Sequence, residues 1–231
     1  MPEGTVMLER QTAAGAPPPE LQKVTNISDM VRKLMASPDA ELINRRSMEF
    51  REAGKSSKEF IFGELCFCIL TANTSAEMGV ATQNAIGNDG FINYSQEDLR
   101  TRLKGVKYRF YNLRSRYIVE ARQVIDQIKD LIANPDRIFV RDYLVQNIKG
   151  IGYKEASHFL RNIGIYDFAI LDKHILRMLR AEYPGINVKV GSRQKYMETE
   201  KLVVDIARSM GMEPGILDLY MWRIATGKII K

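Results

Sequence analysis

The stretch from Leu144 to Leu179 decides the fold and reads LVQNIKGIGYKEASHFLRNIGIYDFAILDKHILRML. Gly150 and Gly152 are separated by one residue, and glycine adopts backbone conformations at tight turns that other residues resist. After this turn, apolar residues recur at the i, i+3, i+4 and i+7 spacing of one buried helix face: Ala156, Phe159, Leu160 and Ile163. The stretch therefore predicts a helix, a glycine turn and a second helix, followed by a third.

Two residues of this stretch are candidates for chemistry. Lys154 lies in the first turn of the second predicted helix, where the helix dipole disfavours its charged form, and a neutral lysine is a nucleophile. Asp172 follows the apolar run 169–171 at the position expected for the N-cap of the third helix. A nearby carboxylate could stabilise a developing cation or accept a proton. Taken singly, each also fits a purely structural role, as a solvated lysine or a helix cap.

The segment 148–163, together with 170–174, resembles the helix–hairpin–helix motif and following aspartate of the base-excision DNA glycosylase superfamily. In its bifunctional members, a lysine at the Lys154 position attacks the sugar C1′, and an aspartate at the Asp172 position is essential. The text KGIGYKEASHFLRN…DKHILR is similar to the short archaeal-type 8-oxoguanine DNA glycosylase/AP lyases, from about Phe50 to Lys231. The resemblance implies a fold of two helical subdomains with the hairpin at the cleft between them.

The same resemblance implies a bifunctional enzyme that flips 8-oxoguanine out of double-stranded DNA, forms a Schiff base and cuts the strand by β-elimination. Two alternatives stay open. The same mechanism could act on another oxidised base, or the hairpin could serve a non-catalytic DNA-binding protein. Lys154 and Asp172 together argue against a simple DNA clamp.

The resemblance also implies contacts with the DNA. The amides of Gly150 and Gly152 are expected to bind the backbone, with a monovalent cation at the hairpin carbonyls as an option. Asn73, in a polar turn after an apolar helix, is expected to reach the estranged base or the space left by the flipped one. Arg109, Phe110 and Tyr111 are expected on a loop, with Phe110 as the wedge and Tyr111 as the substitute choice. By themselves, these aromatic residues also fit inward packing.

Base recognition is assigned to the end of the chain. The related short enzymes end in a lysine, so the resemblance implies that the carboxylate of Lys231 contacts the Watson–Crick edge of guanine. Trp222 is expected to offer a stacking face, and Asp218 is a weaker candidate for binding the base. A frayed tail is the structural alternative at any terminus.

Composition sets the remaining expectations. The 231 residues carry 34 Lys+Arg against 28 Asp+Glu, a net charge of +6 that favours a polyanionic partner. Cys66 and Cys68 lie in an apolar run and are expected to be buried. Since the four cluster cysteines of the endonuclease III group are missing, no iron–sulfur cluster, other cofactor or metal centre is expected. We expect a monomer with no membrane partner, located in the cytoplasm and, in a prokaryote, at the nucleoid.

No segment shows strand alternation long enough for a sheet, so an all-α fold is predicted. Residues 1–20 are expected to be a disordered tail. Residues 21–55 with 167–231 are expected to form one helical subdomain, and residues 56–166 the central one that contains the hairpin. The other predicted helices begin near Ser28, Asp39, Ser75 and Pro214, or span Ser57–Ala72, Ser95–Leu103, Asn112–Leu131 and Tyr196–Met210.

Overall fold

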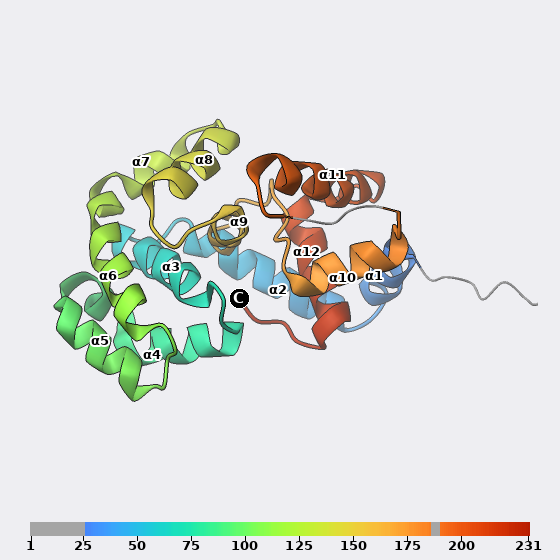
Figure 1. The fold of residues 1–231 in the computed structure, drawn as a ribbon. Helices are drawn as coiled ribbons and strands as arrows, with labels where there is room; N and C mark the ends of the chain where they lie inside the picture. Colours follow the sequence, from blue (N-terminus) through green and yellow to red (C-terminus); the bar gives the residue numbers. More distant parts are fainter. Residues whose placement is uncertain (1–25, 186–189) are drawn as a thin grey trace, which may run out of the picture.

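The computed structural model describes residues 26–185 and 190–231, and within these ranges every regular element is a helix. The predicted all-α class is therefore confirmed, while the expected tail, residues 1–20, lies outside the described residues. The elements are α1 (Ile27–Met35), α2 (Asp39–Ala53), α3 (Lys58–Thr71), α4 (Ala76–Asn93), α5 (Gln96–Gly105), α6 (Tyr111–Ala121), the 3₁₀ helix η1 (Arg122–Gln127), α7 (Ile128–Ala133), α8 (Arg137–Asn147), α9 (Tyr153–Asn162), α10 (Lys173–Glu182), α11 (Arg193–Ser209) and α12 (Pro214–Thr226) (Figure 1).

Local capping explains most helix starts. The side chains of Ser75 and Ser95 accept hydrogen bonds from the backbone amides three residues later, at 3.1 Å in both cases, so these predicted starts are confirmed. The first helix starts two residues earlier than predicted. Its cap is Asn26, whose Oδ1 accepts from the amide of Asp29 at 2.8 Å, and Ser28 lies inside α1.

The helix predicted over residues 112–131 is interrupted by η1. At the interruption, the Arg122 guanidinium donates to the carbonyls of Phe91 at 2.9 Å and Tyr94 at 2.6 Å, which ties this point to the end of α4. These partners lie 31 and 28 residues away in the sequence, so the local apolar pattern could not reveal them.

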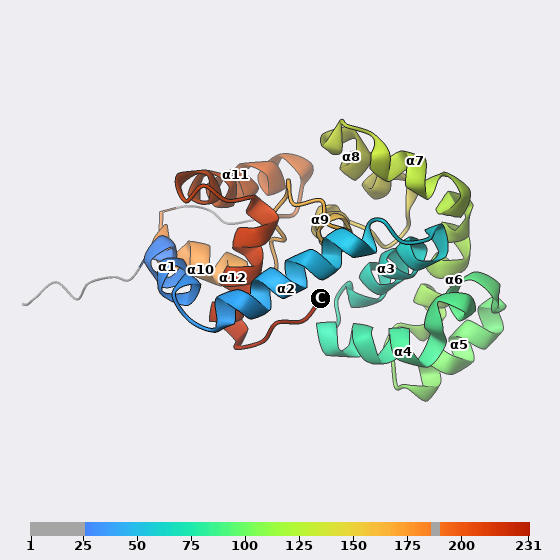
Figure 2. The ribbon, with the colours of Figure 1, turned by 180° about the vertical axis from the view of Figure 1, so that it is seen from behind.

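Buried apolar side chains gather in two clusters, which we call the first and second core. The first core is built from α3 to α9 with η1, and the second from α1, α2 and α10 to α12. The two groups of helices lie side by side, with α2 and α9 between them (Figures 1 and 2). Helix α3 is buried on all sides from residue 61 to residue 71, including Cys66 and Cys68 as predicted.

The linker between α9 and α10 contributes to both cores. Phe168 packs in the first core, whereas Tyr166, Ala169 and Leu171 pack in the second. Asp172 follows directly after the linker, so its position depends on how the linker is held between the two cores.

The end of the chain returns to the middle of the molecule, beside the C-terminal end of α3 in both views (Figures 1 and 2). The Lys231 ammonium forms an ion pair with Glu64 on α3 and donates to Oε1 of Gln83 on α4 at 2.9 Å. Among the described residues, no helix has the length and apolar character needed to cross a membrane.

Candidate active site

The predicted hairpin is present between α8 and α9, and Gly150 is required at its turn. Gly150 has a φ of +86°, in the region that side chains rarely adopt. A Cβ at this position would lie 2.6 Å from a guanidinium nitrogen of Arg114 and 2.7 Å from the ring of Tyr117. Both the dihedral angle and the available space therefore demand glycine.

Lys154 lies in the first turn of α9, with 29% of its side chain exposed. Its Nζ is 2.9 Å from Oε1 of Glu155, and Oε2 of the same carboxylate accepts from the amide of Gly152 at 3.3 Å. Glu155 therefore connects the hairpin amide to the lysine. Sequence reasoning did not single out Glu155, although a glutamate at the third helical position is a capping signal that could have found it.

Asp172 is the N-cap of α10, as predicted. Its Oδ1 accepts from the amides of His174 at 2.8 Å and Ile175 at 2.9 Å. Its Oδ2 accepts from the indole N–H of Trp222 at 3.3 Å. These bonds fix the rotamer of the carboxylate. Both acceptor sites of Oδ1 are used, whereas Oδ2 retains one lone pair that can face a ligand.

One cleft of about 980 Å³ brings the two residues together. Lys154 lines it from α9 and Asp172 from the start of α10. Four other residues predicted for the site line the same cleft: Asn73, Asp218, Trp222 and Lys231. A lysine and a carboxylate thus share one concave site with an indole ring, an arrangement in which a lysine that has lost its proton could attack an electrophilic carbon.

Asn73 lies at the rim in a tightly held turn. It is exposed and has a φ of +63°, a conformation that asparagine tolerates better than most residues. The Tyr108 hydroxyl donates to the carbonyl of Leu70 at 2.6 Å, and Arg114 donates to the carbonyl of Ala72 at 3.0 Å. The backbone next to Asn73 is therefore held by Arg114 of α6 and by Tyr108 of the segment before α6.

The other predicted DNA contacts lie outside the residues that line the cleft. Arg109 is exposed, and its guanidinium carbon is 4.9 Å from the centre of the Phe110 ring, which is half-buried. Phe110 is the N-cap of α6 and Tyr111 its first residue, so the two lie at a helix start and not on the loop expected for them. Their assignment to the DNA stays a prediction.

Asp218 is the most enclosed of the predicted residues, at 1% exposure. Its Oδ2 is 3.0 Å from the Arg161 guanidinium, and its Oδ1 accepts from the amide of Ile170 at 3.2 Å. Burial raises the pKa of Asp218 to about 7, and the charge of Arg161 opposes this rise. Because both carboxylate oxygens are bound by the protein, a structural contact explains Asp218 better than a contact with a base.

His158, which sequence reasoning did not assign to the site, also lines the cleft. It lies one turn after Lys154 on α9, is 8% exposed and packs edge-on against Phe67, with 5.6 Å between ring centres. Burial, and then the positive charges of Arg161 and Lys154, hold the pKa of His158 well below its usual value. The imidazole is therefore neutral near pH 7.

The lysine-bearing hairpin, the capping aspartate and the shared cleft are features of a helix–hairpin–helix protein with a nucleophilic site. The chain belongs to the Ogg-HhH family, 8-oxoguanine DNA glycosylase, whose model matches residues 43–212. It is similar to the 8-oxoguanine DNA glycosylase/AP lyase of Thermoplasma acidophilum, with 55% identity over 189 residues, 82% of this chain and 91% of that protein. The corresponding protein of Methanocaldococcus jannaschii is 46% identical over 203 residues, 87% of this chain and 97% of that one.

Solved structures of 8-oxoguanine DNA glycosylases have the same fold as this chain. The fold matches the Methanocaldococcus jannaschii 8-oxoguanine glycosylase/lyase in complex with a 15mer DNA containing 8-oxoguanine, with a TM-score of 0.84 and 42% identity. This match covers 89% of this chain and 99% of that one. The 8-oxoguanine DNA glycosylase of Thermotoga maritima matches with a TM-score of 0.82 and 38% identity, over 89% of this chain and 98% of that one.

Proposed function

We propose that this protein is a bifunctional DNA glycosylase/AP lyase that excises 8-oxoguanine from double-stranded DNA. The observation that carries the proposal is that Lys154 and Asp172, from different helices, line one cleft in a chain of the 8-oxoguanine DNA glycosylase family. The net charge of +6 supports a polyanionic substrate.

DNA binding begins at the hairpin in this proposal. Gly152 is the N-cap of α9, where a phosphate is favoured by the helix dipole, and Gly150 precedes it in the turn. The amide of Gly152, which donates to Oε2 of Glu155 at 3.3 Å, exchanges this partner for the phosphate when DNA binds. The damaged nucleotide is then flipped out of the duplex at an unstacking cost of a few kcal/mol, which contacts in the cleft must offset. At about 980 Å³, the cleft is large enough for one base and its sugar.

Lys154 acts as the nucleophile. Its Nζ must first lose a proton, and Oε1 of Glu155, 2.9 Å away, is placed to accept it. The nitrogen then bonds to C1′ while the bond from C1′ to the base breaks, and the base leaves with the electron pair and takes up a proton. The Asp172 carboxylate stabilises the cationic sugar during this step.

Strand cleavage follows from the same covalent bond. Opening of the sugar ring gives a Schiff base between C1′ and Nζ of Lys154, which makes the proton at C2′ acidic. Loss of this proton expels the 3′ phosphate by β-elimination. Water later releases the lysine from the sugar fragment, and this regenerates the enzyme.

The remaining assignments concern the base and the DNA. We propose that the flipped base stacks on Trp222 and is read by the main-chain end of Lys231, while Asn73 with Phe110 or Tyr111 occupies the space that it leaves. The contacts of the Lys231 ammonium support this assignment, because they hold the end of the chain at the cleft: Nζ binds Glu64 and Gln83 and lies 5.2 Å from the centre of the Phe67 ring.

We also propose that the protein acts as a monomer at the chromosomal DNA in the cytoplasm, without an iron–sulfur cluster. A monovalent cation could bind at the hairpin carbonyls, of which that of Ile148 already accepts from the Ile151 amide at 3.2 Å and has one lone pair left. No catalytic step above depends on this cation.

A strand-nicking assay tests the function. Duplexes with one 8-oxoguanine, one oxidised pyrimidine or no lesion are incubated with the protein and with Lys154→Gln. We expect nicking of the 8-oxoguanine duplex by the wild type alone. Nicking confined to the pyrimidine lesion would keep the mechanism and change the substrate. Binding without nicking of any duplex would instead leave a non-catalytic DNA-binding protein.

A further inference from the structure

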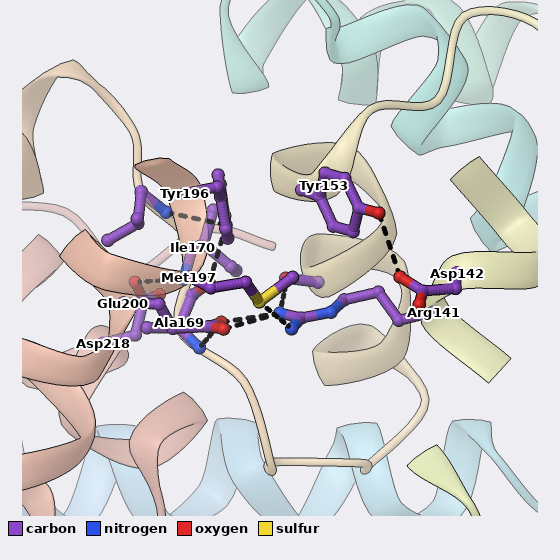
Figure 3. A network of polar contacts seen from close by, with 11 residues as sticks. Arg141, Asp142, Tyr153, Ala169, Ile170, Tyr196, Met197, Glu200 and Asp218 are labelled. Atoms are coloured by element: carbon purple, nitrogen blue, oxygen red, sulfur yellow. Dashed lines mark hydrogen bonds and ion pairs between the residues drawn. The ribbon is translucent and has the colours of Figure 1, made fainter. Parts of the chain in front are cut away.

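The linker between α9 and α10, which ends at Asp172, has a backbone that is bound by side chains. Within the described residues, three successive amides of this linker each have such a partner. The amide of Ala169 donates to Oε1 of Glu200 at 3.1 Å, and the amide of Ile170 donates to Oδ1 of Asp218 at 3.2 Å. The amide of Leu171 donates to the hydroxyl of Tyr196 at 3.3 Å, and this hydroxyl donates to the carbonyl of Ala169 at 2.9 Å (Figure 3).

Both carboxylates that hold the linker are paired with an arginine of the helical hairpin. Arg141 on α8 reaches Glu200 on α11 with 2.7 Å and 2.9 Å between the guanidinium nitrogen and the two oxygens (Figure 3). Arg161 on α9 reaches Asp218 on α12 at 3.0 Å. Each of these four residues is at most 5% exposed.

Buried ion pairs of this kind are not expected to add much to the stability of the fold. Removing two charges from water carries a desolvation cost that their attraction does not reliably offset, and apolar residues of similar volume often serve stability as well. The pairs do restrict the relative orientation of the elements that they join, since a guanidinium and a carboxylate bind each other in few orientations. They fix the linker, and the helices that hold it, relative to the hairpin.

The Arg161–Asp218 ion pair is connected to both proposed reacting groups, Lys154 and Asp172. Arg161 lies on α9 seven residues after Lys154, so these two residues share one face of α9. Asp218 lies on α12 four residues before Trp222, so these two share one face of α12. Trp222 in turn binds Oδ2 of Asp172. The Arg161–Asp218 pair therefore links the helix of the nucleophile to both the backbone and the carboxylate of Asp172.

We propose that Glu200 and Asp218 are positioning residues for the reaction: by binding the linker amides while paired with Arg141 and Arg161, they set the Asp172 carboxylate against the sugar that Lys154 attacks. This inference rests on the proposed function. A displacement of about 1 Å at a reacting group can lower the rate by about a hundredfold, so loosening of the linker is expected to be visible in the chemical step.

The test uses Asp218→Asn and Glu200→Gln, which keep the shape of each side chain but remove its charge. Two control variants remove charges from more exposed ion pairs. Asp142→Asn breaks the pair with Arg193 at 2.9 Å, which joins the same two helices as Arg141 and Glu200. Glu213→Gln breaks the pair with Arg51 at 2.7 Å, which ends at the cap of α12. In the described part of the chain, neither control residue forms a hydrogen bond with the linker amides at 169–171.

The readout is the single-turnover rate of 8-oxoguanine excision with enzyme in excess, at a temperature where circular dichroism shows every variant folded. We expect Asp218→Asn and Glu200→Gln to lower this rate about ten- to hundredfold, with affinity for an abasic-analogue duplex changed by less than about threefold. The controls should match the wild type. A thermal shift without a rate change would mean a structural role only and would overturn the inference.

A double-mutant cycle tests whether Asp218 affects the excision rate through Asp172. In the Asp172→Asn background, Asp218→Asn should cost no further activity, because Asp218 acts through Asp172. An equal loss in both backgrounds would overturn the inference. If excision by Asp172→Asn is too slow to measure, the cycle is run on a preformed abasic site, by the rate of adduct trapping. A wild type that does not excise 8-oxoguanine would instead count against the proposed function.

Discussion

The indole nitrogen of Trp222 lies 3.3 Å from Oδ2 of Asp172 and donates a hydrogen bond to it. The two residues come from different helices, and the other carboxylate oxygen is engaged by the amides at the start of α10. Trp222 therefore acts on the aspartate that the mechanism needs, in addition to the stacking role proposed for its ring. Mutation can separate the hydrogen bond of Trp222 to Asp172 from the stacking of its ring on the base.

Trp222→Phe should separate them, because it keeps an aromatic face and removes the N–H donor. A hydrogen bond to a charged group is worth about 1.5–3 kcal/mol, so a single-turnover rate about tenfold below wild type is expected. Trp222→Ala, which also removes the stacking surface, should lose more and bind the lesion duplex less tightly. Equal rates for Trp222→Phe and the wild type would show that the indole bond does not act on the reaction.

Gly150→Ala should damage the hairpin. The added Cβ would meet Arg114 at 2.6 Å, and the φ of +86° would be strained. We expect a loss of about 1–3 kcal/mol in the free energy of unfolding and weaker DNA binding. Urea denaturation and a duplex titration measure the two effects. Gly105→Ala is the control, since a Cβ there meets nothing within 4 Å, and it should leave DNA binding unchanged.

Glu155→Gln should slow attack by Lys154, because the amide cannot take the lysine proton. General base catalysis is worth about a hundredfold or more, so at least a tenfold slower borohydride trapping on a preformed abasic site is expected. Glu52→Gln, which breaks an exposed pair with Lys55, is the control. Unchanged trapping by Glu155→Gln would mean that another group or water deprotonates Lys154.

The titration of Asp218 should appear in the pH dependence of stability. Its carboxylate faces Arg161 on α9, Asp172 before α10 and the Ile170 amide, and burial raises its pKa from 3.8 to about 7. Between these values, the native state holds a proton that the unfolded chain has released, so the contribution of Asp218 to stability falls as the pH rises.

The comparison is with Asp218→Asn, which does not titrate. The unfolding free energy of the wild type minus that of the variant should decrease from about pH 5 to about pH 7.5 and level off above that. Urea denaturation at several pH values measures it. A difference that grows with pH would mean that Arg161 outweighs burial and keeps the pKa of Asp218 low.

The hairpin and the cap at Asp172 were predictable because their signals are local. Gly150 and Gly152 mark the turn, and Asp172 accepts from amides only two and three residues away. The buried pairs that hold the linker could not be predicted in this way. Arg161 meets Asp218 across 57 residues and Arg141 meets Glu200 across 59, and nothing in the local pattern joins them.

Single residues also differ in whether a local sequence signal or only a distant partner reveals their role. Asp218 was a candidate for binding the base because it precedes Trp222 by one turn, but its burial and its bond to Arg161 emerge only from the tertiary structure. Glu155, in contrast, had a local capping signal next to Lys154. Local patterns thus sufficed to single out Lys154 and Asp172 as candidates, while the groups that we propose to position them are recognised only from tertiary contacts.

The decisive experiment is to map the residue that carries the covalent adduct with the DNA. The protein is incubated with an 8-oxoguanine duplex and sodium borohydride, digested, and the cross-linked peptide is sequenced by mass spectrometry. The account predicts one adduct, on Lys154, in the wild type and none in Lys154→Gln. An adduct on a different lysine of the wild type, or excision of 8-oxoguanine with no adduct at all, would contradict it.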